Sequence, residues 1–160
     1  STLVGPLITA KQRTNVDDLV QAAVAAGARC VRGGTSPQSM DRGWYYEPTV
    51  LDAPDPMNPA NQNEFFGPVV SVLGYRDLDD AIAIANSTEY GLSGGIYTGD
   101  LALGMNLARR FRTGTVQINT GLAAGFTPMG GYKQSGYGRE RGAAGIRAFQ
   151  ELKHIVVGSR

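Results

Sequence analysis

Cysteine and histidine are nearly missing from this 160-residue chain, which contains one of each, Cys30 and His154. One cysteine cannot form an internal disulfide, and one of each residue cannot supply the four ligands of a structural zinc site. No apolar run approaches the roughly 20 residues that a membrane-spanning helix requires, and the first residues lack the charged and apolar segments of a signal peptide. We therefore expect a reducing, cytoplasmic setting, no metal and no membrane partner.

A strong charge of either sign is also missing. The formal net charge is +1, and 18% of the residues are charged while 42% are hydrophobic. This balance gives no electrostatic reason to expect nucleic acid as a partner. The length is sufficient for one domain with a substantial core. Glycine, in contrast, is plentiful at 22 residues, which indicates many turns or close backbone approaches.

Helical and extended patterns alternate along the chain. Thr9 is a candidate N-cap, apolar residues follow it at helical spacing, and Gly27 is a suitable stop, so a helix is predicted between them. Asp77 and Asp100 are candidate caps of two further helices. A last helix is expected at 143–151, and strands at 29–32, 45–51, 69–75, 92–97, 115–119 and 154–157. The proline-rich segment 52–62 is expected to be a connector with no helix. This order predicts an α/β fold with an open, largely parallel sheet flanked by helices.

The longest irregular segment follows the predicted strand that ends at Asn119 and continues to about residue 142. Active sites of open parallel sheets lie at the carboxyl ends of strands, where this loop begins. Standard phosphate-binding patterns do not fit it. Tyr137 stands where a P-loop requires lysine, and the glycines at 136–142 have one residue too many for a dinucleotide fingerprint. Its interleaved aromatic residues argue against disorder, and we interpret it as the wall of a site.

Two side chains outside that loop are candidates for chemistry. Glu64 precedes two aromatic residues and a Gly-Pro break, where a carboxylate could bind sugar hydroxyls or act as a base. The alternative is a solvated Glu64 with Phe65 and Phe66 in the core. Cys30 is flanked by arginines that could activate a thiol, but His154 is remote in sequence and no nearby base is apparent. A structural thiol is the simpler interpretation of Cys30.

Several stretches together resemble the aldehyde dehydrogenase superfamily. Asn63-Glu-Phe-Phe-Gly-Pro-Val69 is similar to its E-x-F-G-P-V signature. Gly114-Thr-Val-Gln-Ile-Asn119, followed by Pro128-Met-Gly-Gly-Tyr-Lys-Gln-Ser-Gly-Tyr-Gly-Arg-Glu140, resembles its G-T-V-x-x-N and P-F-G-G-x-K-x-S-G-x-G-R-E segments. Gly5-Pro6 and Glu47-Pro-Thr-Val50 also match in order, so the resemblance spans nearly the whole chain. The implied fold is that of a catalytic-domain fragment.

The resemblance implies oxidation of an aldehyde to a carboxylic acid, through a thiohemiacetal and a thioester, with NAD or NADP as cofactor. Glu64 matches the carboxylate that binds the nicotinamide ribose, and Phe66 matches the aromatic residue beside the nicotinamide. The residues that match the lining of the aldehyde channel are Gly121, Leu122, Ala123, Phe126 and Met129. Methionine at position 129 departs from the more common phenylalanine, which leaves the preferred aldehyde open.

The family's catalytic cysteine and general-base glutamate match no residue of this chain and would precede Ser1. We therefore expect residues 1–146 to be part of a catalytic domain, and 147–160 to be a segment whose strand 154–157 pairs between subunits of a homo-oligomer. The expected partners are an aldehyde substrate and the N-terminal remainder of the enzyme. The chain alone is expected to be inactive and to bind the cofactor weakly. Two alternatives stay open, a stand-alone α/β binding module and part of a reductase of acyl phosphates or acyl thioesters.

Overall fold

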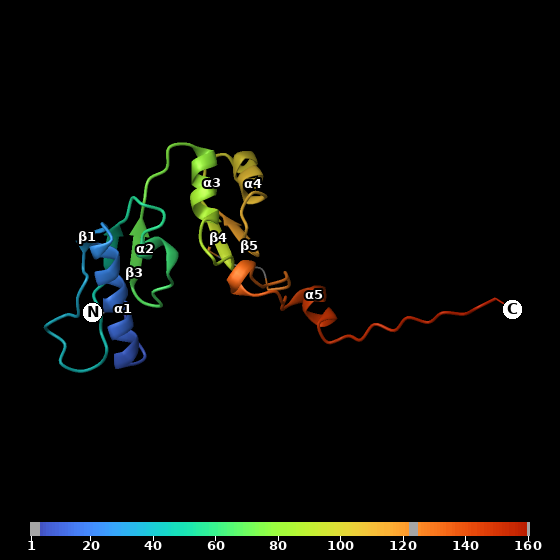
Figure 1. Ribbon diagram of the computed structural model, residues 1–160, viewed down its shortest axis with the longest axis horizontal. Helices are drawn as coiled ribbons and strands as arrows, with labels where there is room; N and C mark the ends of the chain where they lie inside the picture. The colour runs from blue at the N-terminus through green and yellow to red at the C-terminus, as the bar shows by residue number, and fades with distance from the viewer. Residues whose placement is uncertain (1–3, 122–124, 160) are drawn as a thin grey trace. The chain divides into compact units, whose positions relative to one another are not determined.

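The computed structural model describes residues 4–121 and 125–159, and the chain divides into two compact units, Ser1–Thr88 and Glu89–Arg160 (Figure 1). Among the described residues, no helix combines the length and the apolar character needed to cross a bilayer. The same residues bring no three histidine, cysteine, aspartate or glutamate side chains together as metal ligands. The division predicted at residue 146 stays a prediction.

The first unit is built on helix α1 (Ala10–Ala25). As predicted, Thr9 is its N-cap, with its hydroxyl oxygen accepting from the backbone N–H of Gln12 at 3.1 Å. The predicted apolar stripe is confirmed where it is buried, because Val16 and Val20 are almost fully enclosed. Burying each such valine side chain contributes about 1.5–3 kcal/mol. Gly27, with φ of +99°, follows the helix end in the left-handed conformation that glycine tolerates best.

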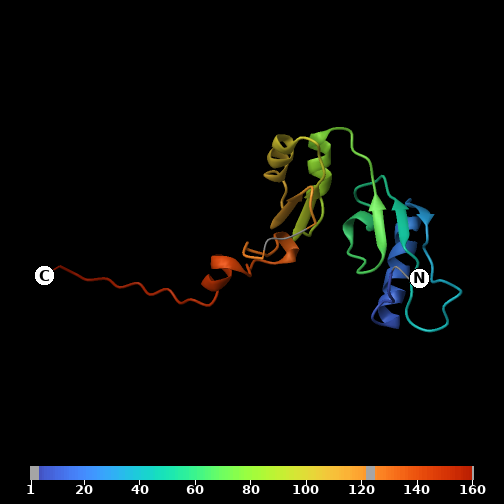
Figure 2. The same cartoon turned by 180° about the vertical axis from the view of Figure 1, so that it is seen from behind.

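This helix packs against a three-stranded sheet of order β1-β2-β3, which lies beside α1 in both views (Figure 1, Figure 2). The strands are β1 (Arg29–Arg32), β2 (Thr49–Asp52) and β3 (Val69–Val72), with β2 parallel to β3 and antiparallel to β1. Leu51 on the central strand is fully buried against the helix. The strand predicted from residue 45 begins only at Thr49, because Pro48 cannot donate to the ladder.

The prediction of no helix in 52–62 was wrong. A short helix, α2 (Pro59–Gln62), occupies the end of that segment. Asn58 is its N-cap, with Oδ1 accepting from the N–H of Ala60 at 2.9 Å, and Pro59 stands at the first helical position. Proline there loses no hydrogen bond and has the φ that a helix requires. The prolines of this segment were expected to exclude a helix, but Pro59 starts one.

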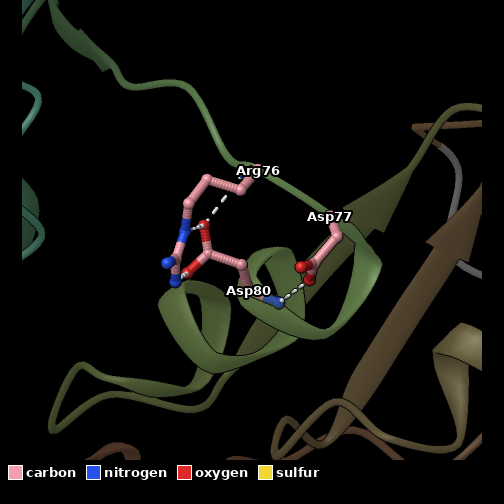
Figure 3. A network of polar contacts seen from close by, with 3 residues as sticks. All are labelled: Arg76, Asp77 and Asp80. Atoms are coloured by element: carbon pink, nitrogen blue, oxygen red, sulfur yellow. Dashed lines mark hydrogen bonds and ion pairs between the residues drawn. The ribbon is translucent and has the colours of Figure 1, made fainter.

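Helix α3 (Leu78–Asn86) begins at the predicted cap, Asp77, whose Oδ1 accepts from the N–H of Asp80 at 2.8 Å (Figure 3). Asp80 reaches back to Arg76, accepting from its backbone N–H at 3.0 Å and from its guanidinium at 3.2 and 2.9 Å. These hydrogen bonds lower the pKa of Asp80 from its ordinary 3.8 to about 2. The side-chain hydrogen bonds from Arg76 have the largest effect, and the backbone hydrogen bond adds to it. The helix start is therefore stabilised by an ionised carboxylate.

We expect this contribution to be complete above about pH 5, where an unfolded aspartate is also ionised, and to be lost as the pH falls toward about 2. A carboxyl-carbon NMR titration should give Asp80 a midpoint near pH 2. The Arg76→Ala variant should move that midpoint upward, because the guanidinium donors are gone. A midpoint that is the same in both proteins would show that Arg76 does not hold the carboxylate.

The second unit contains two parallel strands, β4 (Ser93–Ile96) and β5 (Thr115–Ile118), and helix α4 (Leu101–Ala108). Asp100 caps α4 as predicted, accepting from the N–H of Leu103 at 3.0 Å. Gly104 lies inside this helix, and a Cβ there would lie 3.0 Å from Thr98 and 3.2 Å from Ile118. The close approach of α4 to β5 thus explains the glycine.

The C-terminal part of the second unit holds a 3₁₀ turn, η1 (Lys133–Ser135), and helix α5 (Gly142–Arg147). The helix predicted to reach residue 151 ends at Arg147. Residues 150–159 carry no helix or strand and are exposed (Figure 1). The single chain thus leaves 154–157 unpaired, and its pairing between subunits stays a prediction.

Candidate functional site

The turn that follows α2 presents Glu64 and Phe66 to solvent. Phe65, between them, is buried in the core of the first unit, whereas 73% of Phe66 is exposed. The interpretation that placed both phenylalanines in the core was therefore half right. Phe66 adopts φ of +51°, a left-handed conformation that costs a bulky residue about 1–3 kcal/mol. Strain of this kind persists only where the surroundings hold it.

Helix α1 provides that support. The side-chain amide nitrogen of Gln12 donates to the carbonyl oxygens of Phe65 at 3.0 Å and of Phe66 at 3.2 Å. The turn and the helix together border an open hollow of about 370 Å³. Its walls are formed by Gln12, Asn15, Asp18, Leu19, Glu64, Phe65 and Phe66. Sequence analysis missed Gln12, since nothing local marks a contact across 53 positions.

The chemistry of this hollow suits hydroxyl groups better than phosphates. Glu64 and Asp18 both face it, and ionised carboxylates only accept hydrogen bonds. A pyrophosphate would meet two like charges here, whereas a ribose diol would donate to a carboxylate. The exposed ring of Phe66 offers an apolar face beside them. The hollow therefore offers carboxylate acceptors for hydroxyl groups, with an aromatic ring beside them.

In the second unit, Asn119 fixes the point at which the long loop leaves β5. It has φ of +53°, and its side chain pairs with the backbone of Thr98. Oδ1 accepts from the Thr98 N–H and Nδ2 donates to the Thr98 carbonyl, both at 2.8 Å. The amide thus extends the pairing of the two strands by one position. The chain bends there without leaving the Thr98 backbone groups unsatisfied.

The returning part of the loop packs tightly instead of forming a phosphate cradle. Met129 and Glu140 exchange backbone hydrogen bonds of 2.8 and 2.7 Å. The guanidinium of Arg139 donates to the carbonyls of Gly131 at 2.9 Å and Gly138 at 2.7 Å, and it lies 5.3 Å from the centre of the Tyr132 ring. The backbone N–H groups of Tyr132 and Gln134, which a phosphate cradle would need as donors, bond to the carbonyls of Gly91 and Glu89. The segment is therefore held by hydrogen bonds within the second unit.

The predicted channel residues are distributed over the loop. Gly121 and Phe126 are exposed, the latter by 93%, and Met129 is exposed by 37%. Leu122 and Ala123 lie outside the described residues. Met129 is one wall of a largely apolar cavity of about 420 Å³ against β4 and β5. The structure thus groups Glu64 with Phe66 in the first unit and places Gly121, Phe126 and Met129 in the second.

The only cysteine of the chain, Cys30, lies on β1. Cys30 is exposed, and its Sγ donates to the carbonyls of Arg32 at 3.4 Å and Gly33 at 3.6 Å. Both acceptors are backbone carbonyls, and neither can act as a general base. His154 lies in the exposed segment after α5. We therefore assign no catalytic role to either residue.

A model of the aldehyde dehydrogenase family matches residues 1–155 of this sequence. The chain belongs to that family. A betaine aldehyde dehydrogenase of Brucella melitensis is 42% identical over 161 residues, which cover 98% of this chain and 33% of the relative. A 3-succinoylsemialdehyde-pyridine dehydrogenase of a Pseudomonas species is 41% identical over 157 residues, which cover 97% of this chain and 33% of the relative. The chain spans about a third of the length of the curated relatives it matches.

Solved aldehyde dehydrogenases confirm the predicted fold class. The enzyme of Mycobacterium tuberculosis, complexed with NAD⁺, aligns with a TM-score of 0.88 at 42% identity, over 91% of this chain and 30% of that one. A betaine aldehyde dehydrogenase variant of Staphylococcus aureus, also with NAD⁺, aligns with a TM-score of 0.91 at 37% identity. The alignment covers 96% of this chain and 32% of that one. The family resemblance inferred from the sequence motifs is therefore confirmed.

Proposed function

We propose that this chain contributes the nicotinamide-ribose contact and part of the aldehyde pocket to an NAD(P)-dependent aldehyde dehydrogenase. The observation that carries the proposal is the turn at Glu64 and Phe66, which holds a carboxylate and an exposed ring over one hollow. Glu64 accepts hydrogen bonds from the ribose hydroxyls, and Phe66 packs beside the nicotinamide. When bound, the cofactor accepts the hydride that leaves the aldehyde carbon.

The loop of the second unit provides the substrate contacts in this proposal. Gly121, Leu122, Ala123, Phe126 and Met129 line the path of the aldehyde. Met129 is held by its paired hydrogen bonds with Glu140, which favours a defined wall at this point. Methionine is flexible and polarizable, so it suits aldehydes with irregular apolar groups. Oxidation to the acid needs a thiolate and a general base, and we assign neither to this chain.

Assembly and location complete the proposal. We place the enzyme in the cytoplasm as a homo-oligomer, in which 154–157 adds to a strand of another subunit. The exposed, β-branched run Ile155–Val157 supports this, because an exposed apolar segment of this kind can be buried by pairing with a strand edge of another subunit. The N-terminal remainder of the enzyme would supply the thiolate and the base.

Ligand-observed NMR with NAD⁺ and the 160-residue chain tests the cofactor contact. The Glu64→Gln variant should weaken NAD⁺ binding by about tenfold, because charge-assisted hydrogen bonds to the ribose contribute roughly 1.5 kcal/mol more than neutral ones. The Glu151→Gln variant, at an exposed position after α5, should leave the affinity unchanged. Equal affinities for the chain and its Glu64→Gln variant would refute the ribose contact. Aldehyde turnover by the chain alone would contradict the assignment of the thiolate elsewhere.

A further inference from the structure

One side chain of α1 connects the helix to the turn that carries Glu64 and Phe66. The amide nitrogen of Gln12 has two hydrogens, and they serve two successive carbonyls, Phe65 O at 3.0 Å and Phe66 O at 3.2 Å. One turn further along the helix, Val16 limits the same segment, since a Cβ on Gly67 would lie 2.7 Å from its Cγ2. Positions i and i+4 share a helix face, so α1 holds this turn at two points.

The turn needs such support because its own packing is one-sided. Phe65 is buried and fixes one end, but the Phe66 ring projects into solvent and cannot hold its left-handed backbone. Two consecutive carbonyls that point the same way repel each other unless a donor lies between them. The Gln12 amide is that donor. With these carbonyls fixed, the direction of the preceding Glu64 side chain is restricted as well.

We propose that Gln12 is a positioning residue, which sets the Glu64–Phe66 turn for cofactor binding through the carbonyls of Phe65 and Phe66. This inference rests on the proposed function. The residue type follows from the geometry. Asparagine would be one methylene too short to span the gap, and glutamate would direct a carboxylate at two carbonyl oxygens. Methionine would match the length but would bring no donor.

The experiment compares the full chain with its Gln12→Met and Gln12→Glu variants. The matched control is Gln21→Met, at an exposed glutamine of the same helix. Without ligand, backbone NMR shifts of residues 65–67 should change in both Gln12 variants and stay constant in the control. In Gln12→Glu the shifts should return partly toward those of the unsubstituted chain at low pH, because a protonated carboxyl group can donate to one carbonyl. A general loss of stability would not reverse in this way.

Binding of NAD⁺ provides the second measurement. Gln12→Met should weaken NAD⁺ binding by about fivefold, as expected for the loss of a neutral hydrogen-bond anchor. In a Glu64→Gln background the same change should have a smaller effect, because Gln12 then positions only the Phe66 contact. Independent, multiplicative effects of the two substitutions would overturn the positioning role.

The two proposals fail in different ways. Equal NAD⁺ affinities of the unsubstituted chain and its Glu64→Gln variant would overturn the proposed function. Unchanged shifts of residues 65–67 in Gln12→Met would overturn the inference about Gln12, whether or not NAD⁺ binds. Changed shifts with a weakened, Glu64-dependent affinity would support both.

Discussion

Replacing Gly114 with alanine should destabilise the second unit by about 3 kcal/mol or more, at the upper end of what overpacking costs. Gly114 begins the segment that becomes β5, and it lies directly against the backbone of Gly130. An added Cβ would overlap the Gly130 carbonyl oxygen and would lie 2.8 Å from its carbonyl carbon. Both atoms belong to the main chain, so no side chain can rotate away. The segment that carries Met129 must move instead.

Gly95→Ala is the matched control for this substitution. Gly95 lies on β4 of the same two-stranded sheet, and a Cβ there would have no atom within 4 Å. Urea denaturation should therefore show a large decrease in the free energy of unfolding for Gly114→Ala and a change near zero for Gly95→Ala. NMR shifts of Met129 and Glu140 should change only in the first. Equal stability of the two variants would mean that the loop does not pack against β5 in solution.

The sequence predicted those elements whose signals are local. Thr9, Asp77 and Asp100 each cap a helix as expected, because an N-cap acts on the backbone of the next three residues. The parallel pairing of β2 with β3 and of β4 with β5 follows from the alternation of strands and helices. Family membership also came from local motifs, and their order along the chain made them specific.

Features set by contacts across the sequence could not be predicted. The exposure of Phe66 beside a buried Phe65 depends on a left-handed turn that Gln12 holds from 54 positions away. The glycine content indicated turns or close backbone approaches without showing which glycine serves which purpose. At Gly131 it is a close approach, because a Cβ would lie 2.6 Å from the carbonyl oxygen of Ser135. Helix α2 was missed because the prolines of 52–62 outweighed the Asn58-Pro59 start signal. The roles of Glu64 and the channel residues stay predictions.

Asn58 should be the most sensitive polar position of the first unit. It is only 2% exposed, and its Nδ2 donates to the carbonyls of Ala23 at 3.1 Å and Ala26 at 3.2 Å, at the end of α1. Its Oδ1 caps α2 at the same time. The side chain thus joins the end of one helix to the start of the helix that leads to Glu64. Asn58→Asp keeps the shape and the cap but loses both donors.

At pH 7 we expect Asn58→Asp to lower the free energy of unfolding by about 3–5 kcal/mol, because it buries a carboxylate against two carbonyl oxygens. Burial should raise the pKa of the new carboxyl group in the folded state, so its ionised form opposes folding. The loss should therefore shrink as the pH falls toward about 4, where the group is protonated and can donate one hydrogen bond. Asn63→Asp is the control, since the side chain of this exposed residue donates to the Pro59 carbonyl at the surface. Its free energy of unfolding should fall by no more than about 1 kcal/mol. Urea denaturation at pH 7 and pH 4 separates the two variants. A loss for Asn58→Asp that is small, or that does not depend on pH, would mean that Asn58 is not enclosed between the two helices.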